Sequence, residues 1–263
     1  MRKMQLQIRR NNRKNGFAVF PAPRSGRCPI FRTPVFIWAC VLSSDVVYCH
    51  KREKRMEINM KSSKLYFKYG AMGSSKTAQA LMTRFNYEEK GSKVWLIKPS
   101  TDNRDGAAIL RSRIGLEATA DIITPEMSIR KIFDVMQLDG ANYEVIISDE
   151  AQFFTEEQIW QLREIVSDYN IPVFCFGLRT DFQCRLFPGS KALLQLADDI
   201  IEIKSVCNCG HKAFVNARFD ENGKVTVLGP QVELGGNDRY ESMCWTCWRK
   251  ALKENGFDNV RSF

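Results

Sequence analysis

The stretch Leu65-Tyr-Phe-Lys-Tyr-Gly70-Ala-Met-Gly73-Ser-Ser-Lys76-Thr77 joins an apolar, aromatic run to a turn with two glycines, and a helical pattern follows it. A strand, a turn and a helix N-terminus in this order form a cradle for an anion, because backbone N–H groups point inward and the helix dipole favours negative charge. The stretch is close to the pattern G-x-x-x-x-G-K-[ST] of phosphate-binding loops. We therefore predict a nucleotide-phosphate site, and the alternative is an ordinary glycine- and serine-rich turn that caps a helix.

Each part of this loop has an expected role. Lys76 is expected to reach the β- and γ-phosphates, and the hydroxyl group of Thr77 is expected to hold Mg²⁺. Ser75 stands where the pattern has its second glycine. If this position needs a positive φ, serine costs about 1 kcal/mol relative to glycine. The expected phosphate-binding residues of the loop are Gly70, Ala71, Met72, Gly73, Ser74, Ser75, Lys76 and Thr77.

The positive charge of the chain is concentrated near its N-terminus. The formal net charge of +9 would by itself suggest nucleic acid or a membrane surface as a partner. Residues 1–57 hold 13 Lys and Arg and 3 Asp and Glu, which leaves 26 of the 39 basic and 27 of the 30 acidic residues for 58–263. The body therefore has a net charge of −1, and we expect neither nucleic acid nor a membrane as its partner.

Residues 1–60 differ in composition and periodicity from the rest of the chain. Residues 1–57 contain four prolines and many arginines and show no sustained periodicity. The apolar run Pro34–Leu42 is shorter than the roughly 20 residues that span a bilayer, and no clear cleavage site for a signal peptide follows it. We expect a disordered basic extension, or a protein that begins at Met56 or Met60, and a cytoplasmic location.

From Leu65 onward, apolar runs of strand length alternate with helical patterns. Such alternation indicates an α/β fold whose parallel sheet is covered on both faces, here over residues 61–204. Ala78, Leu81, Met82 and Phe85 share one face of the first helix. Strands are expected at 65–69, 93–98 (ended by Pro99), 144–148, 172–177 and 200–204; helices are expected at 76–89, 155–167 (capped by Thr155) and 190–197, and a helix or loose segment at 127–136.

Two carboxylates follow the apolar strand that ends at Ser148. Ligands of a parallel sheet bind beyond the carboxyl ends of its strands, so Asp149 is expected to face the phosphate loop and to orient Mg²⁺. Glu150 points elsewhere and is free to abstract a proton. Taken alone, an Asp-Glu pair after a strand also fits a helix-capping pair. Together with the phosphate loop upstream, the pair favours a second nucleotide element.

Four of the nine cysteines form two close pairs, Cys207/Cys209 and Cys244/Cys247. Close pairs in a chain without an obvious secretion signal suggest a metal rather than disulfides, and four thiolates suit zinc. The first pair is one residue short of the usual spacing, so His211 could replace one thiolate; buried free cysteines are the alternative. We expect a satellite domain over 205–255, too small to have its own core and fixed by zinc, and a tail over 256–263.

Five stretches stand in one order: Gly70-Ala-Met-Gly-Ser-Ser-Lys-Thr77, Asp149-Glu-Ala-Gln-Phe-Phe154, Gly177-Leu-Arg-Thr-Asp-Phe182, the cysteine pairs and Gly235-Gly-Asn-Asp-Arg-Tyr240. Together they resemble the thymidine kinase family of the cellular, tetrameric, zinc-containing type, over about residues 64–252. The resemblance implies a RecA-like P-loop core, a zinc-binding subdomain and a "lasso" loop from Val227 to Tyr240 that closes over the nucleoside. It also implies phosphorylation of thymidine by ATP with Mg²⁺, a structural zinc ion and a homotetramer.

The resemblance also assigns roles by matching positions. Glu150 would take the proton of the 5′-hydroxyl group, and Arg104, Asp149 and Gln152 would lie on the phosphate side. Tyr240 would pack on the nucleoside, although the aromatic residues of this set also fit a core role. The remaining residues of the thymine pocket would be Met72, Phe153, Leu178, Phe182 and Phe187.

Two rival functions remain at the level of the sequence. One is a RecA-type P-loop ATPase that acts on nucleic acid, with the cysteine-rich domain as its binding module. The near-neutral body argues against it. The other is a non-catalytic nucleotide-binding relic, which Ser75 makes conceivable.

Overall fold

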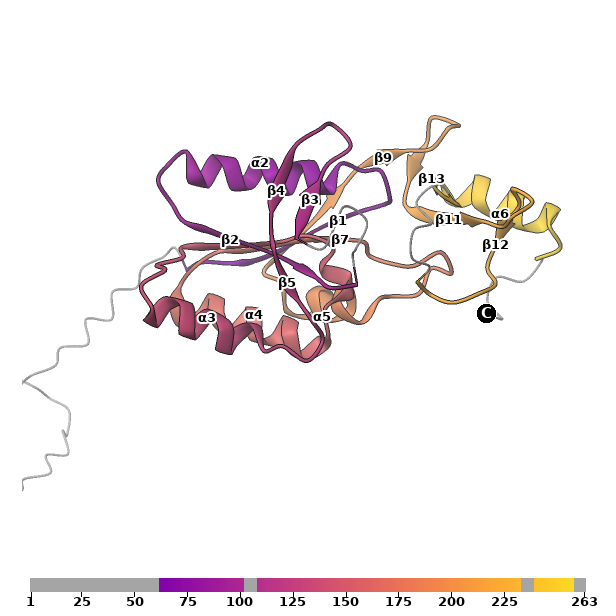
Figure 1. The fold of residues 1–263 in the computed structure, drawn as a ribbon. Helices are drawn as coiled ribbons and strands as arrows, with labels where there is room; N and C mark the ends of the chain where they lie inside the picture. The colour runs from indigo at the N-terminus through magenta and orange to yellow at the C-terminus, as the bar shows by residue number, and fades with distance from the viewer. Residues whose placement is uncertain (1–61, 102–107, 233–238, 258–263) are drawn as a thin grey trace, which may run out of the picture. The chain divides into compact units, whose positions relative to one another are not determined.

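The computed structural model describes residues 62–101, 108–232 and 239–257, and all of them fall within the unit Glu57–Phe263. The expected basic extension, Arg104, the central part of the lasso and most of the tail lie outside the described residues. Figure 1 shows a sheet with helices on its two faces. None of the helices in the described ranges is long and apolar enough to cross a membrane.

Six strands form the central sheet in the order β5-β2-β6-β7-β1-β8, and every neighbouring pair is parallel. The predicted α/β class with a parallel sheet is confirmed. The inner strands are almost continuously buried, as expected when helices cover both faces of a sheet. The strands are β1 (Leu65–Gly70), β2 (Val94–Pro99), β5 (Asp121–Ile123), β6 (Val145–Ser148), β7 (Val173–Gly177) and β8 (Asp199–Ile203).

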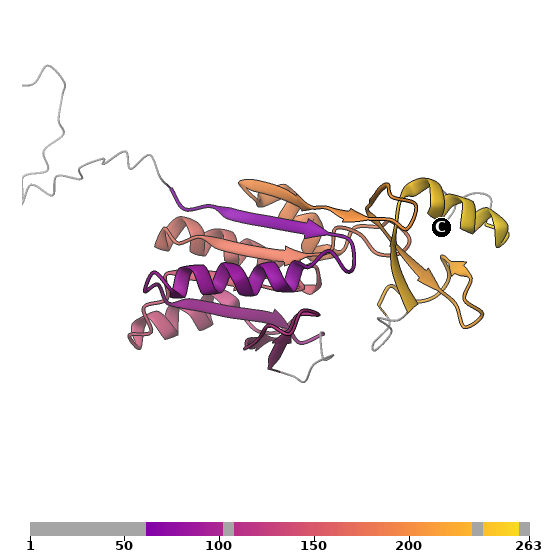
Figure 2. The ribbon, with the colours of Figure 1, turned by 90° about the horizontal axis from the view of Figure 1, so that it is seen from above.

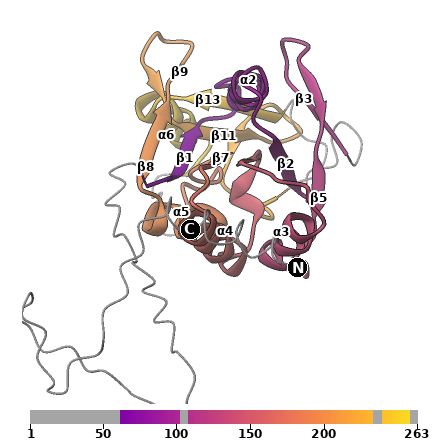
Figure 3. The ribbon, with the colours of Figure 1, turned by 90° about the vertical axis from the view of Figure 1, so that its left-hand side faces the viewer.

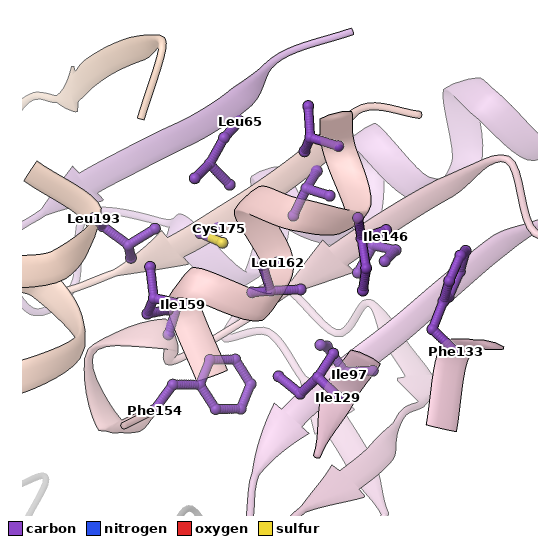
Figure 4. Packing of buried hydrophobic residues seen from close by; sticks show 14 of the residues in the cluster. Leu65, Ile97, Ile129, Phe133, Ile146, Phe154, Ile159, Leu162, Cys175 and Leu193 are labelled. Atoms are coloured by element: carbon purple, nitrogen blue, oxygen red, sulfur yellow. The ribbon is translucent and has the colours of Figure 1, made fainter. Parts of the chain in front are cut away.

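Helix α2 (Lys76–Glu88) lies on one face of the sheet, as Figures 2 and 3 show from above and from the side. On the other face lie α3 (Ile129–Leu138), α4 (Glu156–Tyr169) and α5 (Pro188–Leu196). Side chains of these three helices and of the strands form the larger hydrophobic cluster of the protein, part of which Figure 4 shows. A second cluster lies under α2. The strand ends are thus held by packed cores on both sides.

The ends of the helices follow their capping residues. Thr155 caps α4 through a capping box with Gln158, as its position before two glutamates predicts. Ser128 caps the segment for which the sequence left a helix or a loose stretch open, and the structure shows helix α3 there. A 3-10 turn, η1 (Ala151–Phe153), follows the Asp149-Glu150 pair.

Three local features of the sheet domain differ from the sequence predictions. A hairpin of β3 (Ile109–Arg111) and β4 (Glu117–Thr119), and the edge strand β5, were not anticipated because three-residue strands give no period to detect. Pro99 is the last residue of β2 rather than a residue beyond it, since the next N–H group, from Ser100, bonds to Ile123. Met82 and Phe85 are 54% and 62% exposed, so they do not face the sheet with Leu81.

The C-terminal part contains short antiparallel strands and one helix: β9 (Ser205–Val206), β10 (Lys212–Ala213), β11 (Val215–Phe219), β12 (Val225–Thr226), β13 (Tyr240–Met243) and α6 (Trp245–Glu254). The expectation that this part lacks a core of its own is wrong. Trp248 and Leu252 of α6 are fully buried against β11 and its neighbours, because α6 presents apolar residues at helical spacing. The core is small, however, with six buried residues.

Candidate active site and cysteine cluster

The loop between β1 and α2 is tightly curled. A side chain at Gly70 would place its Cβ atom 2.3 Å from Ser74 Oγ and 2.7 Å from the carbonyl oxygen of Ile203, so only glycine fits. Gly73 has a φ of 75°, which glycine adopts without strain. The helix begins directly after this curl, and its first N–H groups face the loop as the anion cradle requires.

Ser75 adopts the left-handed conformation that the glycine of the motif would adopt. Its φ is 63° and its ψ is 26°, so this position does have the positive φ that the sequence analysis considered. The conformation costs about 1 kcal/mol for a residue with a Cβ atom. Strained residues of this kind concentrate at functional sites.

Lys76 lies inside the loop. It is only 7% exposed, and its Nζ atom donates hydrogen bonds to the carbonyl oxygens of Ala71, at 2.9 Å, and Gly70, at 3.3 Å. The buried hydroxyl group of Ser74 has no hydrogen-bond partner within the described part of the chain. A buried ammonium group and an orphaned hydroxyl group therefore lie together in the curl, as expected of a site for an anion.

Asp149 meets the phosphate loop although β7 separates β6 from β1 in the sheet. The Thr77 hydroxyl group donates to Asp149 Oδ2 at 2.7 Å, while Oδ1 is buried without a partner among the described residues. Burial raises the pKa of Asp149 to about 7, with a further rise from the charge of Glu150; the Thr77 hydrogen bond and Lys76 act in the opposite direction. A carboxylate that is hard to ionise without a cation and has a free oxygen fits an Mg²⁺ site.

Glu150 is also in a left-handed conformation, with a φ of 50°. The Gln152 side chain donates a hydrogen bond to Glu150 Oε2 and accepts one, at 2.9 Å, from the backbone N–H group of Leu178. A Cβ atom at Gly177 would lie 2.6 Å from Gln152 Oε1, so glycine makes room for this contact. The buried Gln152 amide thus fixes Glu150 to the carboxyl end of β7, while the phosphate-side role predicted for Gln152 stays a prediction.

All six predicted pocket residues are among those that the structure describes, whereas the central part of the lasso is not. The rings of Phe153 and Phe187 meet edge to face with 5.5 Å between centroids. Phe182 is fully buried, and the Arg218 guanidinium group lies 3.7 Å from the centre of its ring. Leu178 is buried, whereas Met72 and Tyr240 are half-buried. The structure thus joins Phe153 to Phe187; the substrate roles of the whole set stay predictions.

Asn216 is a residue near the site that sequence reasoning missed. It lies on β11 and is 3% exposed. Its Oδ1 atom accepts a hydrogen bond from the N–H group of Met72 at 2.8 Å, and its Nδ2 atom donates to the carbonyl group of Thr180 at 2.7 Å. One amide therefore connects the phosphate loop, the segment after β7 and the C-terminal part. A polar residue inside an otherwise apolar strand was the available signal.

The segment after β7 is also joined to the beginning of the lasso. Asp181 accepts hydrogen bonds from the N–H groups of Gln183 and Arg185 with one oxygen and from the Gln231 side chain, at 2.9 Å, with the other. Arg218 donates to the carbonyl groups of Leu228 and Pro230. These polar contacts and the burial of Val227 in the C-terminal hydrophobic cluster therefore hold the start of the lasso.

The four C-terminal cysteines come together. Their Sγ atoms all lie within 4.8 Å of one another, and Cys209 and Cys244 are 3.6 Å apart. Zinc–sulfur bonds of about 2.3 Å in a tetrahedron place sulfur atoms about 3.8 Å apart, so the cluster fits zinc. His211 is outside this group and contacts Cys209 through Nδ1 at 3.3 Å. Backbone N–H groups of Cys209 and Cys244 lower the pKa of Cys207 to about 7, which favours a thiolate ligand.

Comparison with known proteins decides the family. A sequence profile described as "Thymidine kinase" matches residues 63–248. The chain belongs to the thymidine kinase family. The thymidine kinase of Legionella pneumophila subsp. pneumophila is 41% identical over 201 residues, which are 76% of this chain and 96% of that protein. That of Ruegeria pomeroyi is 41% identical over 196 residues, 74% of this chain and 98% of that protein.

The similarity to solved structures is weaker. The Pif1 helicase from Candida albicans is 14% identical, with a TM-score of 0.33, and the match covers 56% of this chain and 37% of that chain. A likeness of this size carries no argument about function. The family profile and the curated relatives therefore favour a thymidine kinase over the alternative function of a nucleic-acid ATPase.

Proposed function

We propose that this thymidine kinase transfers the γ-phosphoryl group of ATP to the 5′-hydroxyl group of thymidine. The observation that carries the proposal is the meeting of Thr77 with Asp149 at 2.7 Å, which brings the phosphate loop and the Asp149-Glu150 pair to one place. Family membership supplies the substrate class. Phosphoryl transfer depends mainly on positioning and charge neutralisation, and this site offers both.

The phosphate side of the site consists of the loop backbone, Lys76, Thr77 and Asp149, with Arg104 outside the described residues. Lys76 lies in the curl and would exchange its bonds to Gly70 and Ala71 for phosphate oxygens. Thr77 and Asp149 would hold Mg²⁺, which when bound neutralises charge on the phosphates. The unpartnered Asp149 Oδ1 atom supports this assignment.

Glu150 is proposed as the general base. An ionised carboxylate at this position would accept the proton of the 5′-hydroxyl group. The bond from that oxygen to the γ-phosphorus forms while the bond to the β,γ-bridging oxygen breaks, and ADP leaves with the electron pair. Gln152, which bonds Glu150 and the Leu178 N–H group, would keep the carboxylate in place.

The thymidine pocket is proposed to lie beside Glu150, between the segment after β7 and the lasso. Phe153 follows the Asp149-Glu150 pair along the chain and Phe187 directly precedes α5, and their rings are in contact. The segment that carries Leu178 and Phe182 is connected to the lasso by Asp181 and Gln231. The nucleoside would pack on these apolar residues together with Met72 and Tyr240.

Zinc is proposed as a structural ion held by Cys207, Cys209, Cys244 and Cys247. The mutual distances support four thiolate ligands, with His211 next to one of them rather than among them. With four protein ligands the site has no open position for chemistry. Thiolate ligands also support the proposal of a cytoplasmic location, because a reducing compartment preserves them.

A homotetramer is the proposed assembly. Met82 and Phe85 on the outer side of α2 are more than half exposed, and Leu116 of the β3–β4 turn is 39% exposed beside them. These residues line one groove with a volume of about 690 Å³. A contiguous apolar surface of this kind supports contact with another copy of the chain.

A nucleoside panel tests the proposed function. The protein would be incubated with ATP, Mg²⁺ and thymidine, deoxyuridine, deoxycytidine or deoxyadenosine, and the monophosphates separated by chromatography. We expect thymidine monophosphate as the main product and no increase in ADP release on addition of single-stranded DNA. ADP release that depends on DNA and not on thymidine would overturn the proposal in favour of the nucleic-acid ATPase.

A further inference from the structure

The hairpin of β3 and β4 lies against the same face of the sheet as α2. Leu110 of β3 is 2% exposed and belongs to one hydrophobic cluster with Ala80 and Leu81 of α2. The buried Lys98 side chain donates a hydrogen bond of 2.9 Å to the carbonyl group of Ile109. The base of the hairpin is therefore fixed next to the helix that begins at the phosphate loop.

The tip of the hairpin is an ordered turn. The Ser112 hydroxyl group accepts a hydrogen bond from the N–H group of Leu116 at 3.0 Å, and the backbone groups of these two residues bond at 2.8 Å. Gly115 has a φ of 85° and its N–H group bonds to Ser112. Ser112 is buried, so the turn places Arg113, the first of the three residues between Ser112 and Leu116, next to a fixed residue.

Arg113 lies at the phosphate loop. A Cβ atom built on Gly73 would be 3.6 Å from Arg113 Nη1, and no other atom of the described residues, apart from the adjoining ones, comes within 4 Å of it. Gly73 is in the middle of the loop, between Gly70 and Lys76. The guanidinium group thus lies next to Gly73, on the loop whose backbone would surround the phosphates.

No carboxylate in the described part of the chain neutralises this guanidinium group. Among the residues that the structure describes, Arg113 has neither an ion pair nor a hydrogen bond to a protein group, whereas Arg111 on the same hairpin is paired with Glu117 at 3.1 Å. The buried Ser74 hydroxyl group, one residue beyond Gly73, is without a partner as well. An unpaired cation beside the phosphate loop and an orphaned polar atom on that loop indicate an anionic ligand.

We propose that Arg113 is a further phosphate-binding residue of the kinase site and that its guanidinium group binds the β- and γ-phosphates of ATP from the side opposite Lys76. The proposal rests on the proposed function. A planar guanidinium group matches phosphate oxygens with two donors at once, which a lysine cannot do. Its charge stabilises the γ-phosphoryl group and the ADP oxygen during transfer, in the manner of an arginine finger supplied by the same chain.

Three variants test the proposal: Arg113→Ala, Arg113→Lys and the matched control Arg111→Ala. We expect Arg113→Ala to lower kcat/KM for ATP by about 10²-fold or more, since arginine fingers contribute about 10³–10⁵ in kcat, and to leave KM for thymidine within about 2-fold. Arg113→Lys keeps the charge without the fork and should retain an intermediate activity, about 10-fold below the parent. Arg111→Ala should stay within about 2-fold of the parent because an exposed ion pair contributes little.

Chemical rescue separates phosphate binding from an effect on hairpin structure. Added guanidinium ion at low millimolar concentration should raise the turnover of Arg113→Ala and not that of Arg111→Ala. Equal losses in both alanine variants, or an Arg113→Ala variant within about 3-fold of the parent, would overturn the proposal.

The experiments distinguish a failure of this inference from a failure of the proposed function. If the parent protein does not phosphorylate thymidine, the proposed function fails. Arg113 is then judged by equilibrium binding of ATP. Weaker binding in Arg113→Ala than in Arg111→Ala supports the phosphate contact, and equal binding rejects it.

Discussion

The sheet domain and the cysteine-containing part are held together by different means. In the sheet domain two hydrophobic clusters cover both faces of six parallel strands. The C-terminal part has one hydrophobic cluster of six buried residues and a group of four cysteines. Among the described residues, the buried side-chain amide of Asn216 joins this part to the phosphate loop. The difference indicates that apolar packing positions Asp149 and Glu150, whereas a cysteine cluster that fits zinc and a few hydrogen bonds hold the C-terminal part.

The largest effect is expected from Cys244→Ser, which removes one proposed zinc ligand. Structural zinc contributes about 10–16 kcal/mol to the folding of small zinc-binding peptides, so loss of the ion should unfold a part with so small a core. Hydrogen exchange should show loss of protection in β11 and β13 and unchanged protection in β1, β6 and β7. Metal analysis should show less than one zinc per chain.

Cys184→Ser is the matched control, because Cys184 is half-buried near the same core but outside the cluster. It should keep its zinc and its pattern of exchange. Retention of zinc in Cys244→Ser, with loss of zinc in His211→Ala, would show instead that the histidine completes the site. Loss of protection throughout the sheet in Cys244→Ser would contradict the division into two differently held regions.

Glu150→Gln tests the role of a carboxylate that the packing of the sheet domain positions. We expect kcat to fall by at least about 10²-fold, because the amide cannot accept the proton. ATP binding and the free energy of unfolding should change little, since glutamine can keep a hydrogen bond to Gln152. The exposed Glu164→Gln on α4 serves as the control in steady-state kinetics with ATP and thymidine. Unchanged turnover in Glu150→Gln would reject the assignment of the base.

Asn216→Ala tests the connection between the regions. The substitution leaves the N–H group of Met72 and the carbonyl group of Thr180 unpaired, at a cost of about 1–3 kcal/mol. The KM for ATP should rise, and Asn216→Asp, which keeps an acceptor for Met72, should recover part of it. Kinetics and denaturant unfolding would be compared with Asn222→Ala, an exposed residue of the β11–β12 turn. Equal behaviour of the two alanine variants would show that the amide does not couple the regions.

The same comparison explains how much the sequence revealed. Apolar runs such as Val145–Ser148, followed at once by Asp149 and Glu150, predicted both a buried strand and the position of its carboxylates, because the ends of parallel strands are ligand sites. The meeting of Thr77 and Asp149 follows from this rule. The cysteine spacing likewise predicted the cluster that the structure brings together.

Other features depend on contacts between distant segments and leave no local pattern. Asn216 acquires its importance from Met72 and Thr180, which are 144 and 36 residues away along the chain. Arg113 reaches Gly73 only because a hairpin of three-residue strands folds over α2. The core of α6 and β11 was missed for a related reason: it also includes a residue of β12, a strand of two residues that has no detectable period.

The smallest effect is expected from Ser75→Gly in the phosphate loop. Ser75 is exposed and has a φ of 63°, so glycine removes a conformational cost of about 1 kcal/mol, offset in part by its greater freedom in the unfolded chain. Denaturant unfolding without nucleotide should show a gain of a few tenths of a kcal/mol up to about 1 kcal/mol. Ser92→Gly, at a position without a positive φ, should instead lose about 0.5–1 kcal/mol. A loss in both variants would mean that the sheet domain holds its phosphate loop without strain. A gain at Ser75 alone would show that the sheet domain, and not the part with the cysteine cluster, carries this strained backbone.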